Sequence, residues 1–218
     1  MVFPNSAVVS IPPRSSWNAG KGTTSSLLTE ILQADGKHKI FLTGNIGKQA
    51  PLDFLDQLSV DDLVVFELSS FQLENLEQSP PIGICLMVTN DHLDYHNSQS
   101  DYWQAKQAIA KFQKTQDHLI YNLDYEGSVA IGKLGAGAKL GISGKQTVKQ
   151  GAQINAQAEE IEINLGETQF TLITSDRVIK GAHNLENIAA ASLAASLLGV
   201  EEQVITNTIT TFVGLPHR

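Results

Sequence analysis

The sequence contains a single cysteine, Cys85, so no disulfide bond can form within the chain. Cys85 lies in the apolar run IGICLMV, which indicates a buried thiol in a reducing compartment rather than a reactive one. No apolar run approaches the ~20 residues that a membrane-spanning helix needs, and the proline-broken start MVFPNSAVVSIPPRSS does not have the form of a signal peptide. We therefore expect a cytoplasmic protein.

Basic residues are also scarce, because 15 Lys and Arg stand against 23 Asp and Glu, for a formal net charge of −8. Nucleic-acid binding needs a concentration of basic side chains that displaces counterions. A general polyanion binder is therefore excluded, and any recognition of phosphate must be local. The 218 residues, 42% of them hydrophobic, suffice for one large domain or two small ones.

Apolar periodicity predicts alternating helices and strands in the first part of the chain. Strands 62–70 and 81–90 are nearly continuous in apolar and β-branched residues, as in strands that are covered on both faces. Such alternation is typical of an α/β fold with a doubly wound, mainly parallel sheet. The predicted elements are helix 23–36, strand 38–44, helix 51–58, strands 62–70 and 81–90, helix 100–114 and strand 117–123.

The composition changes near Lys133, where a glycine-rich stretch of short alternating segments runs to Ser175. This stretch predicts a small β meander, with its clearest hairpin at 159–173. Helical patterns return at 185–199 and 201–212.

The segment Gly20-Lys21-Gly22-Thr23 precedes a helix and could be the end of a phosphate-binding loop, as in a P-loop-like ATP site. Backbone N–H groups and the positive end of the helix dipole would hold the phosphates there. Lys21 would reach the β- and γ-phosphates, and Thr23 or Thr24 could place a hydroxyl on Mg²⁺. The alternative is a solvated lysine ahead of a hydroxyl helix cap.

Acidic and imidazole side chains follow two of the predicted strands. Glu67 ends the first, and Asp91, His92, Asp94 and His96 follow the second, so they should meet at the carboxyl edge of the sheet, where α/β folds bind ligands. Together they could coordinate a divalent cation. The alternatives are that Glu67 faces water, that His92 is structural and that His96 is a surface residue.

Three further features could belong to a nucleotide site. Lys106 falls on the inner side of its predicted helix, where the amine either pairs with acids or is modified into an anion, unless it reaches solvent. Asn184 and Asn187 lie one turn apart at a helix start, where they could read a purine ring or Asn184 could cap the helix. Arg218 carries a guanidinium suited to phosphate charge.

These motifs together resemble the central domain of the Mur ligases, from Gly20 to the last residue. ELSSFQLE and GNIG are the most specific and resemble the D-glutamate-adding members of the family. The resemblance implies ATP- and Mg²⁺-dependent amide formation in peptidoglycan precursor synthesis, through an acyl phosphate that the amine of D-glutamate displaces. The motifs, in order, are GKGTTS, GNIG, ELSSFQLE, TNDHLDYH, YWQAKQAI, GAHNLENIAAA and GLPHR.

The resemblance also implies roles for individual residues. Catalysis would involve Lys21, His92 and Lys106, and Lys106 matches a lysine that the family carbamylates. Thr23, Glu67, His92 and carbamylated Lys106 would contact metal, while Asn45 and Ser69 would line the muramoyl side. The ATP site would comprise Gly20, Lys21, Gly22, Thr23, Thr24, Asn184, Asn187 and Arg218.

The resemblance stops inside the phosphate motif, because Trp17, Asn18 and Ala19 stand where the family has Gly-Thr and one further residue. Our hypothesis is that residues 1–19 are an aberrant segment from a shifted reading frame or misassigned start, and that residues 20–218 are the central ATP-binding domain. We expect the UDP-binding and amino-acid-binding domains to be absent, and the isolated chain to be a monomer without ligase turnover. The UDP-muramoyl precursor and D-glutamate would then be partners of a longer parent. The alternatives are a non-catalytic remnant that binds nucleotide weakly or not at all, and another Mur or folylpolyglutamate-type ligase.

Overall fold

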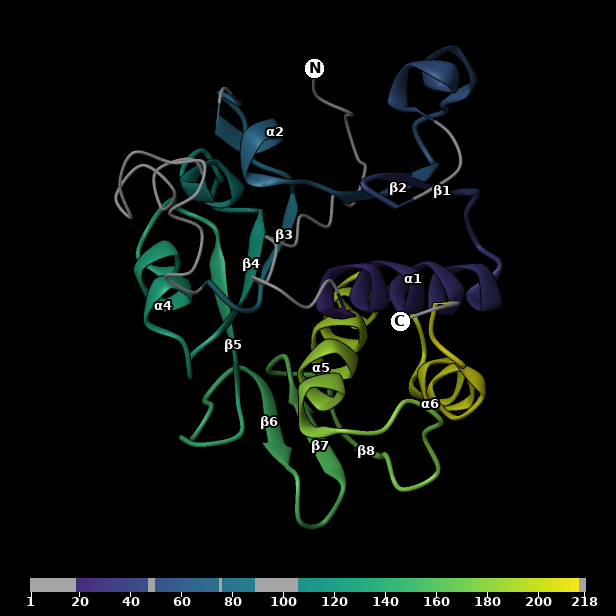
Figure 1. Ribbon diagram of the computed structural model, residues 1–218, viewed down its shortest axis with the longest axis vertical. Coiled ribbons are helices and arrows are strands. Elements are labelled where there is room, and N and C mark those ends of the chain that lie inside the picture. The colour runs from purple at the N-terminus through teal and green to yellow at the C-terminus, as the bar shows by residue number, and fades with distance from the viewer. Residues whose placement is uncertain (1–18, 47–49, 75, 89–105, 216–218) are drawn as a thin grey trace.

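A computed structural model describes residues 19–46, 50–74, 76–88 and 106–215, and Figure 1 shows how their elements are arranged. Helix α1 spans Ala19–Asp35 and begins four residues before the predicted start at Thr23. The helix ends before Gly36, whose φ of +71° is the left-handed conformation that favours glycine after a helix. The apolar stripe of this helix is buried throughout and comprises Leu27, Leu28, Ile31 and Leu32.

The first sheet contains two parallel strands, β1 (Ile40–Gly44) and β2 (Leu63–Glu67), and both were predicted. The predicted helix 51–58 between them was wrong. Two 3₁₀ turns, η1 (Pro51–Asp53) and η2 (Leu55–Gln57), stand in its place. Phe54, with φ of −126°, interrupts the helical backbone between them, which separates the two turns.

The second sheet has six strands in the order of the chain. The first four are parallel, and the last three pair antiparallel, so the sheet is mostly parallel as predicted. The expected meander is not a separate subregion, because two of its strands continue the parallel part of this sheet. The strands are β3 (Ile82–Cys85), β4 (His118–Asn122), β5 (Ala138–Ser143), β6 (Gly151–Asn155), β7 (Glu160–Asn164) and β8 (Gln169–Ile173).

Helices α5 (Ala182–Leu197) and α6 (Glu202–Thr211) confirm the last two helical predictions, and α2 (Ser70–Glu74) follows β2. In the described part of predicted helix 100–114, Lys106 precedes only a short 3₁₀ turn, η3 (Gln107–Ile109). Phe112, near the end of the predicted helix, is 38% exposed because the chain leaves the helical path at Ala110. The sequence pattern also missed α4 (Glu126–Gly132), which contains two glycines.

One apolar core joins the two sheets, although in the ranges that the structure describes β2 and β3 are not paired in a strand ladder. Leu63 and Val65 of β2 belong to the same buried cluster as Ile82 and Ile84 of β3, together with the apolar stripe of α1 and most of α5. Figure 1 shows α1 lying between the β1–β2 sheet and α5 and α6. None of the described helices has the length and apolar character needed to cross a bilayer.

The sheet requires a glycine where β6 approaches β5, and this requirement is testable. Gly151 has φ of +128°, and an added Cβ would run into the carbonyl oxygen of Gly141, whereas Gly199 has φ of +77° with open space around it. A left-handed non-glycine residue costs about 1–2 kcal/mol, and a steric clash adds about 1–3 kcal/mol. We expect Gly151→Ala to lower the free energy of unfolding in urea by more than Gly199→Ala does. Equal losses would show that the clash is relieved.

Candidate functional site

The carboxyl ends of β1 and β2 bring two of the predicted site residues together. Gly44 is opposite Glu67 in the parallel ladder, and the Asn45 N–H donates to the Glu67 carbonyl oxygen at 3.1 Å. Asn45 is exposed, whereas the Glu67 side chain is only 3% exposed. The predicted alternative, a glutamate facing water, is therefore wrong for Glu67.

Ser69 immediately precedes the short helix α2 and forms a reciprocal cap with Gln72. Gln72 Oε1 accepts from the Ser69 N–H at 2.8 Å and from the Ser69 hydroxyl at 3.0 Å, and the backbone N–H of Gln72 donates to Ser69 Oγ at 3.3 Å. This is the capping box that a serine followed three residues later by glutamine predicts. The SSFQ part of ELSSFQLE therefore has a structural explanation, and the substrate contact of Ser69 stays a prediction.

Lys106 is fully buried, as predicted from its place on the inner side of the segment. Lysine is almost never fully buried unless it is paired. Its charge is near enough to the Cys85 thiol to counteract part of the rise in that thiol's pKa. The alternative of a lysine that extends to solvent is therefore wrong. Carbamylation of Lys106 remains a prediction.

A relay of side-chain hydrogen bonds, here called the asparagine relay, joins α1 to the start of α5. The Thr24 hydroxyl donates to Asn187 Oδ1 at 3.1 Å, Asn187 Nδ2 donates to Asn184 Oδ1 at 2.9 Å, and Asn184 Nδ2 donates to the Lys180 carbonyl at 2.8 Å. Thr24 and Asn187 are buried, while Asn184 is partly exposed. The relay places the two asparagines directly beside the first turns of α1.

Asn184 does not cap α5, which was one of its predicted alternatives. The N-cap is Gly181, with φ of +100°, and its carbonyl accepts the Asn184 N–H at 3.1 Å. Asn184 lies inside the first turn, so its carboxamide enters the asparagine relay instead of bonding to the backbone N–H groups of the helix start.

The sequence patterns missed a third contact of this helix start. The Tyr125 hydroxyl, after β4, donates to Glu186 Oε1 on α5 at 2.9 Å. The polar residues that follow β4 could have indicated a contact at this edge, because the carboxyl end of β4 lies at the same edge of the sheet as that of β3. Together with Thr24 and Lys180, Tyr125 ties the first turn of α5 to three other segments.

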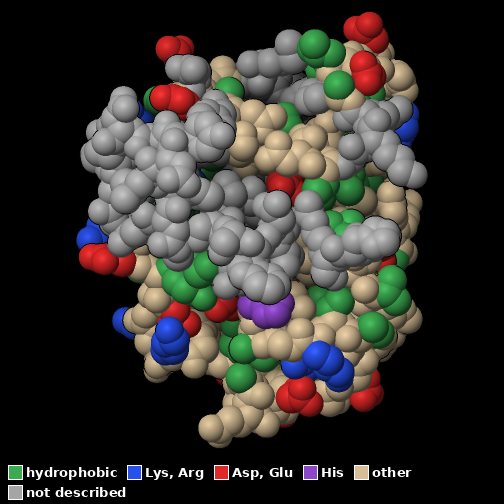
Figure 2. All heavy atoms as spheres, in the orientation of Figure 1, with side chains coloured by type: hydrophobic (Ala, Val, Ile, Leu, Met, Phe, Trp, Pro, Cys, Tyr) green, Lys and Arg blue, Asp and Glu red, His purple; other side chains and the backbone are tan. Residues whose placement is uncertain are grey.

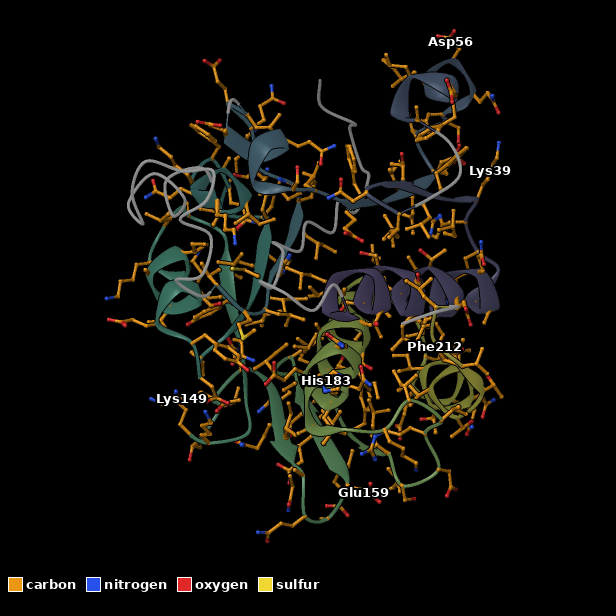
Figure 3. All side chains as sticks on the ribbon, in the orientation of Figure 1. Lys39, Asp56, Lys149, Glu159, His183 and Phe212 are labelled. Atoms are coloured by element: carbon orange, nitrogen blue, oxygen red, sulfur yellow. The ribbon has the colours of Figure 1, made fainter. Side chains whose placement is uncertain are left out.

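This end of α5 is at the surface of the molecule. Figure 3 labels His183 on the first turn, and Figure 2, in the same orientation, shows a histidine side chain exposed at that place. Basic and acidic side chains are scattered over the described part of this face in Figure 2. The described part of this face is therefore not a basic surface.

Several predicted site residues lie outside the described residues: Asp91, His92, Asp94, His96 and Arg218. The backbone of Gly20, Lys21 and Gly22 lies in the first turns of α1, but the Lys21 side chain is outside the description. The meeting of Glu67 with His92 therefore remains a prediction.

The described residues offer oxygen ligands that suit Mg²⁺. Thr23 is buried in α1, and Glu67 is buried at the end of β2. Carboxylate and hydroxyl oxygens are hard ligands of the kind that this ion prefers. Among the described side chains, no group of three His, Cys, Asp or Glu residues comes together that could hold a metal by itself.

A family model described as the Mur ligase middle domain matches residues 18–195. The UDP-N-acetylmuramoylalanine–D-glutamate ligase of Bacillus mycoides is 38% identical over 200 residues, 91% of this chain and 43% of that protein. The enzyme of the same name from Acetivibrio thermocellus is 36% identical over 200 residues, with 91% and 42% covered. The chain thus spans less than half the length of these curated relatives.

Solved structures show the same fold at lower identity. MurF from Acinetobacter baumannii superposes with a TM-score of 0.67 at 18% identity, over 95% of this chain and 46% of that one. A pseudomurein peptide ligase type C from Methanothermus fervidus gives 0.68 at 17% identity, over 98% and 50%.

The burial of Cys85, which was predicted, gives stability a measurable pH dependence. Burial is the main cause that raises the pKa of its thiol from 9.0 to about 11, while a hydrogen bond to Ser128 and the charge of Lys106 oppose the rise. The neutral thiol stabilises the fold fully below pH 9, and this contribution is lost as pH rises toward 11, because the unfolded thiol ionises first. In urea unfolding from pH 8 to 11, we expect the wild type to lose more stability than Cys85→Ala. Parallel pH profiles would contradict this.

Proposed function

The chain belongs to the Mur ligase middle domain family, and on this basis we propose that it is the ATP-binding part of a ligase that adds D-glutamate to UDP-N-acetylmuramoyl-L-alanine. The names of the relatives at 36% and 38% identity support this substrate pair. The motifs ELSSFQLE and GNIG support the same branch of the family. The product would be an amide in a peptidoglycan precursor.

The asparagine relay is the observation that carries the proposal. The amino end of α1 offers N–H groups and a positive dipole to phosphates. Asn184, which can read the donor and acceptor edges of a base, is tied through Asn187 to Thr24 on the same helix. The relay thus links a helix end that would bind phosphates to an asparagine that would hydrogen-bond to a purine, and an ATP site requires both.

Different residues of this chain would bind the phosphates, orient the base and contact the second substrate. Lys21 would neutralise the β- and γ-phosphates from the first turn of α1, and Arg218 would add a second cation. Asn184 would orient the base, so that the γ-phosphate meets the substrate carboxylate at a fixed place. Asn45 and Ser69, at the carboxyl ends of β1 and β2, would contact the muramoyl substrate.

Thr23 and Glu67 would hold Mg²⁺ together with His92 and carbamylated Lys106. Mg²⁺, when bound, neutralises the charge that develops on the phosphate oxygens during transfer to the carboxylate. Glu67 is suited to this role because its carboxylate lies buried at the carboxyl end of β2 rather than in bulk water. The amine of D-glutamate would then attack the acyl carbon of the acyl phosphate, forming the amide bond and displacing inorganic phosphate. We further propose that the protein acts in the cytoplasm, as a monomer and without nucleic acid.

A second candidate is a non-catalytic remnant. Trp17-Asn18-Ala19 stands in place of the glycine-containing half of the phosphate motif. The first glycine of such a motif permits a close approach of backbone to phosphate, which a tryptophan resists. This candidate predicts weak or absent nucleotide binding with the same fold.

Calorimetric titration with Mg-ATP separates the two candidates. We expect micromolar binding by the wild type, and binding about tenfold weaker by Asn184→Ala, because losing hydrogen bonds to a base costs about 1.4 kcal/mol. Asn207→Ala, on the exposed face of α6, removes the same amide elsewhere and serves as the matched control. Absence of heat with the wild type would support the remnant, and equal affinities of the two variants would remove Asn184 from the site.

A further inference from the structure

Arg177 is a buried cation that the proposed reaction does not use. It lies between β8 and α5 and is 5% exposed. Its Nη1 donates to Glu159 Oε1 and to the Thr174 carbonyl oxygen, both at 2.6 Å. Burying a guanidinium is expensive unless it is paired, so an arginine in this place calls for an explanation.

Glu159, the partner of Arg177, is itself unusual. Its φ of +55° lies in the left-handed region, which non-glycine residues enter rarely and at a cost. Its carbonyl oxygen accepts the Thr174 N–H at 2.7 Å and the Thr174 hydroxyl at 2.6 Å. Glu159, Thr174 and Arg177 therefore form one unit, here called the Arg177 clamp, at the end of the β7–β8 hairpin.

The Arg177 clamp fixes the path of the chain into α5. Only two residues separate Arg177 from Lys180, whose ammonium donates to the Ser175 carbonyl at 2.8 Å and closes the loop on itself. Between them, Ile179 packs against the main apolar core. The carbonyl of Lys180 is thereby held at a set position in front of the first turn of α5, where Figure 3 labels His183.

That carbonyl sets the direction of the asparagine relay. A backbone carbonyl can only accept, so Asn184 must present Nδ2 to Lys180 and Oδ1 to Asn187. Asn187 must then present Oδ1 to the Thr24 hydroxyl, which donates. If the Lys180 carbonyl moved away, the carboxamides of Asn184 and Asn187 could both rotate by half a turn. Every remaining hydrogen bond of the relay would still join a donor to an acceptor.

We propose that Arg177 is a positioning residue that, through the Lys180 carbonyl, fixes the Asn184 carboxamide to select a purine with a 6-amino group. The inference rests on the proposed function, since it needs a purine at Asn184. The relay uses one N–H and one lone pair of Asn184, so each atom keeps one for a ligand. A 6-aminopurine presents a donor beside the N7 acceptor and matches this pair, whereas a 6-oxopurine presents two acceptors.

The test compares Arg177→Met, which keeps the apolar length of the side chain, with Arg177→Lys, which keeps one donor for the Thr174 carbonyl. Lys149→Met, at an exposed site, is the control for loss of a cation. The side-chain amide resonances of Asn184 report the relay by NMR, and titrations with Mg-ATP and Mg-ITP report selection of the base. We expect Arg177→Met to shift the Asn184 resonances and to reduce the ATP:ITP affinity ratio about tenfold, with partial rescue by Arg177→Lys.

Loss of thermal stability in Arg177→Met, with unchanged Asn184 resonances and an unchanged affinity ratio, would overturn the inference, because the clamp would then be only structural. If Arg177→Met does not fold, Glu159→Gln, which weakens the same clamp from its half-exposed side, takes its place with the same expected results. A wild type that binds neither nucleotide overturns the proposed function and the selection of the base. The Asn184 resonances then still decide whether Arg177 positions the relay.

Discussion

The hydrogen bond from the Thr24 hydroxyl to Asn187 is the contact on which the arrangement of the site depends. It crosses the interface between α1 and α5, two helices whose contacting residues are separated by 163 positions in the chain. Both side chains are buried, so breaking this contact would leave polar groups without water to replace the lost partner. Sliding α5 along α1 would therefore break this hydrogen bond, in addition to reducing the apolar contact between the two helices.

Small side chains make this contact possible. The middle of α5 is rich in alanine, and its buried positions belong to the same core as the apolar stripe of α1. Alanine adds little volume between helices, so the two backbones can approach closely and a short side chain such as threonine can reach across. The helix pair then holds the amino end of α1 and the first turn of α5 in one orientation, while Tyr125 fixes that turn to the sheet.

The carboxyl ends of β1 and β2 supply the second part of the proposed site. There the parallel register sets Gly44 beside Glu67, and the backbone bond from Asn45 continues the ladder by one step. The buried carboxylate of Glu67 lies at the end of an almost fully apolar strand. This combination is typical of parallel sheets, in which the interior of the strand stabilises the fold and its carboxyl end is available for binding.

The sequence left open whether Lys106 is buried or reaches solvent, but by itself it determined the order of the main strands, their parallel character, the burial of Cys85, and the motifs that place the chain in its family. These properties follow from local periodicity and composition, because a strand covered on both faces or a helix with one apolar stripe must show it in its own residues. The same local patterns suggested a helix at 51–58 and one that continues to 114, but the backbone takes 3₁₀ turns at 51–57 and at 107–109 instead. Only the tertiary structure decided that Asn184 joins a relay rather than capping α5, that Tyr125 contacts Glu186, and that Arg177 pairs with Glu159. The physical reason is that a hydrogen bond between distant segments depends on where packing places both partners. The residues next to each partner in the sequence carry no information about that position.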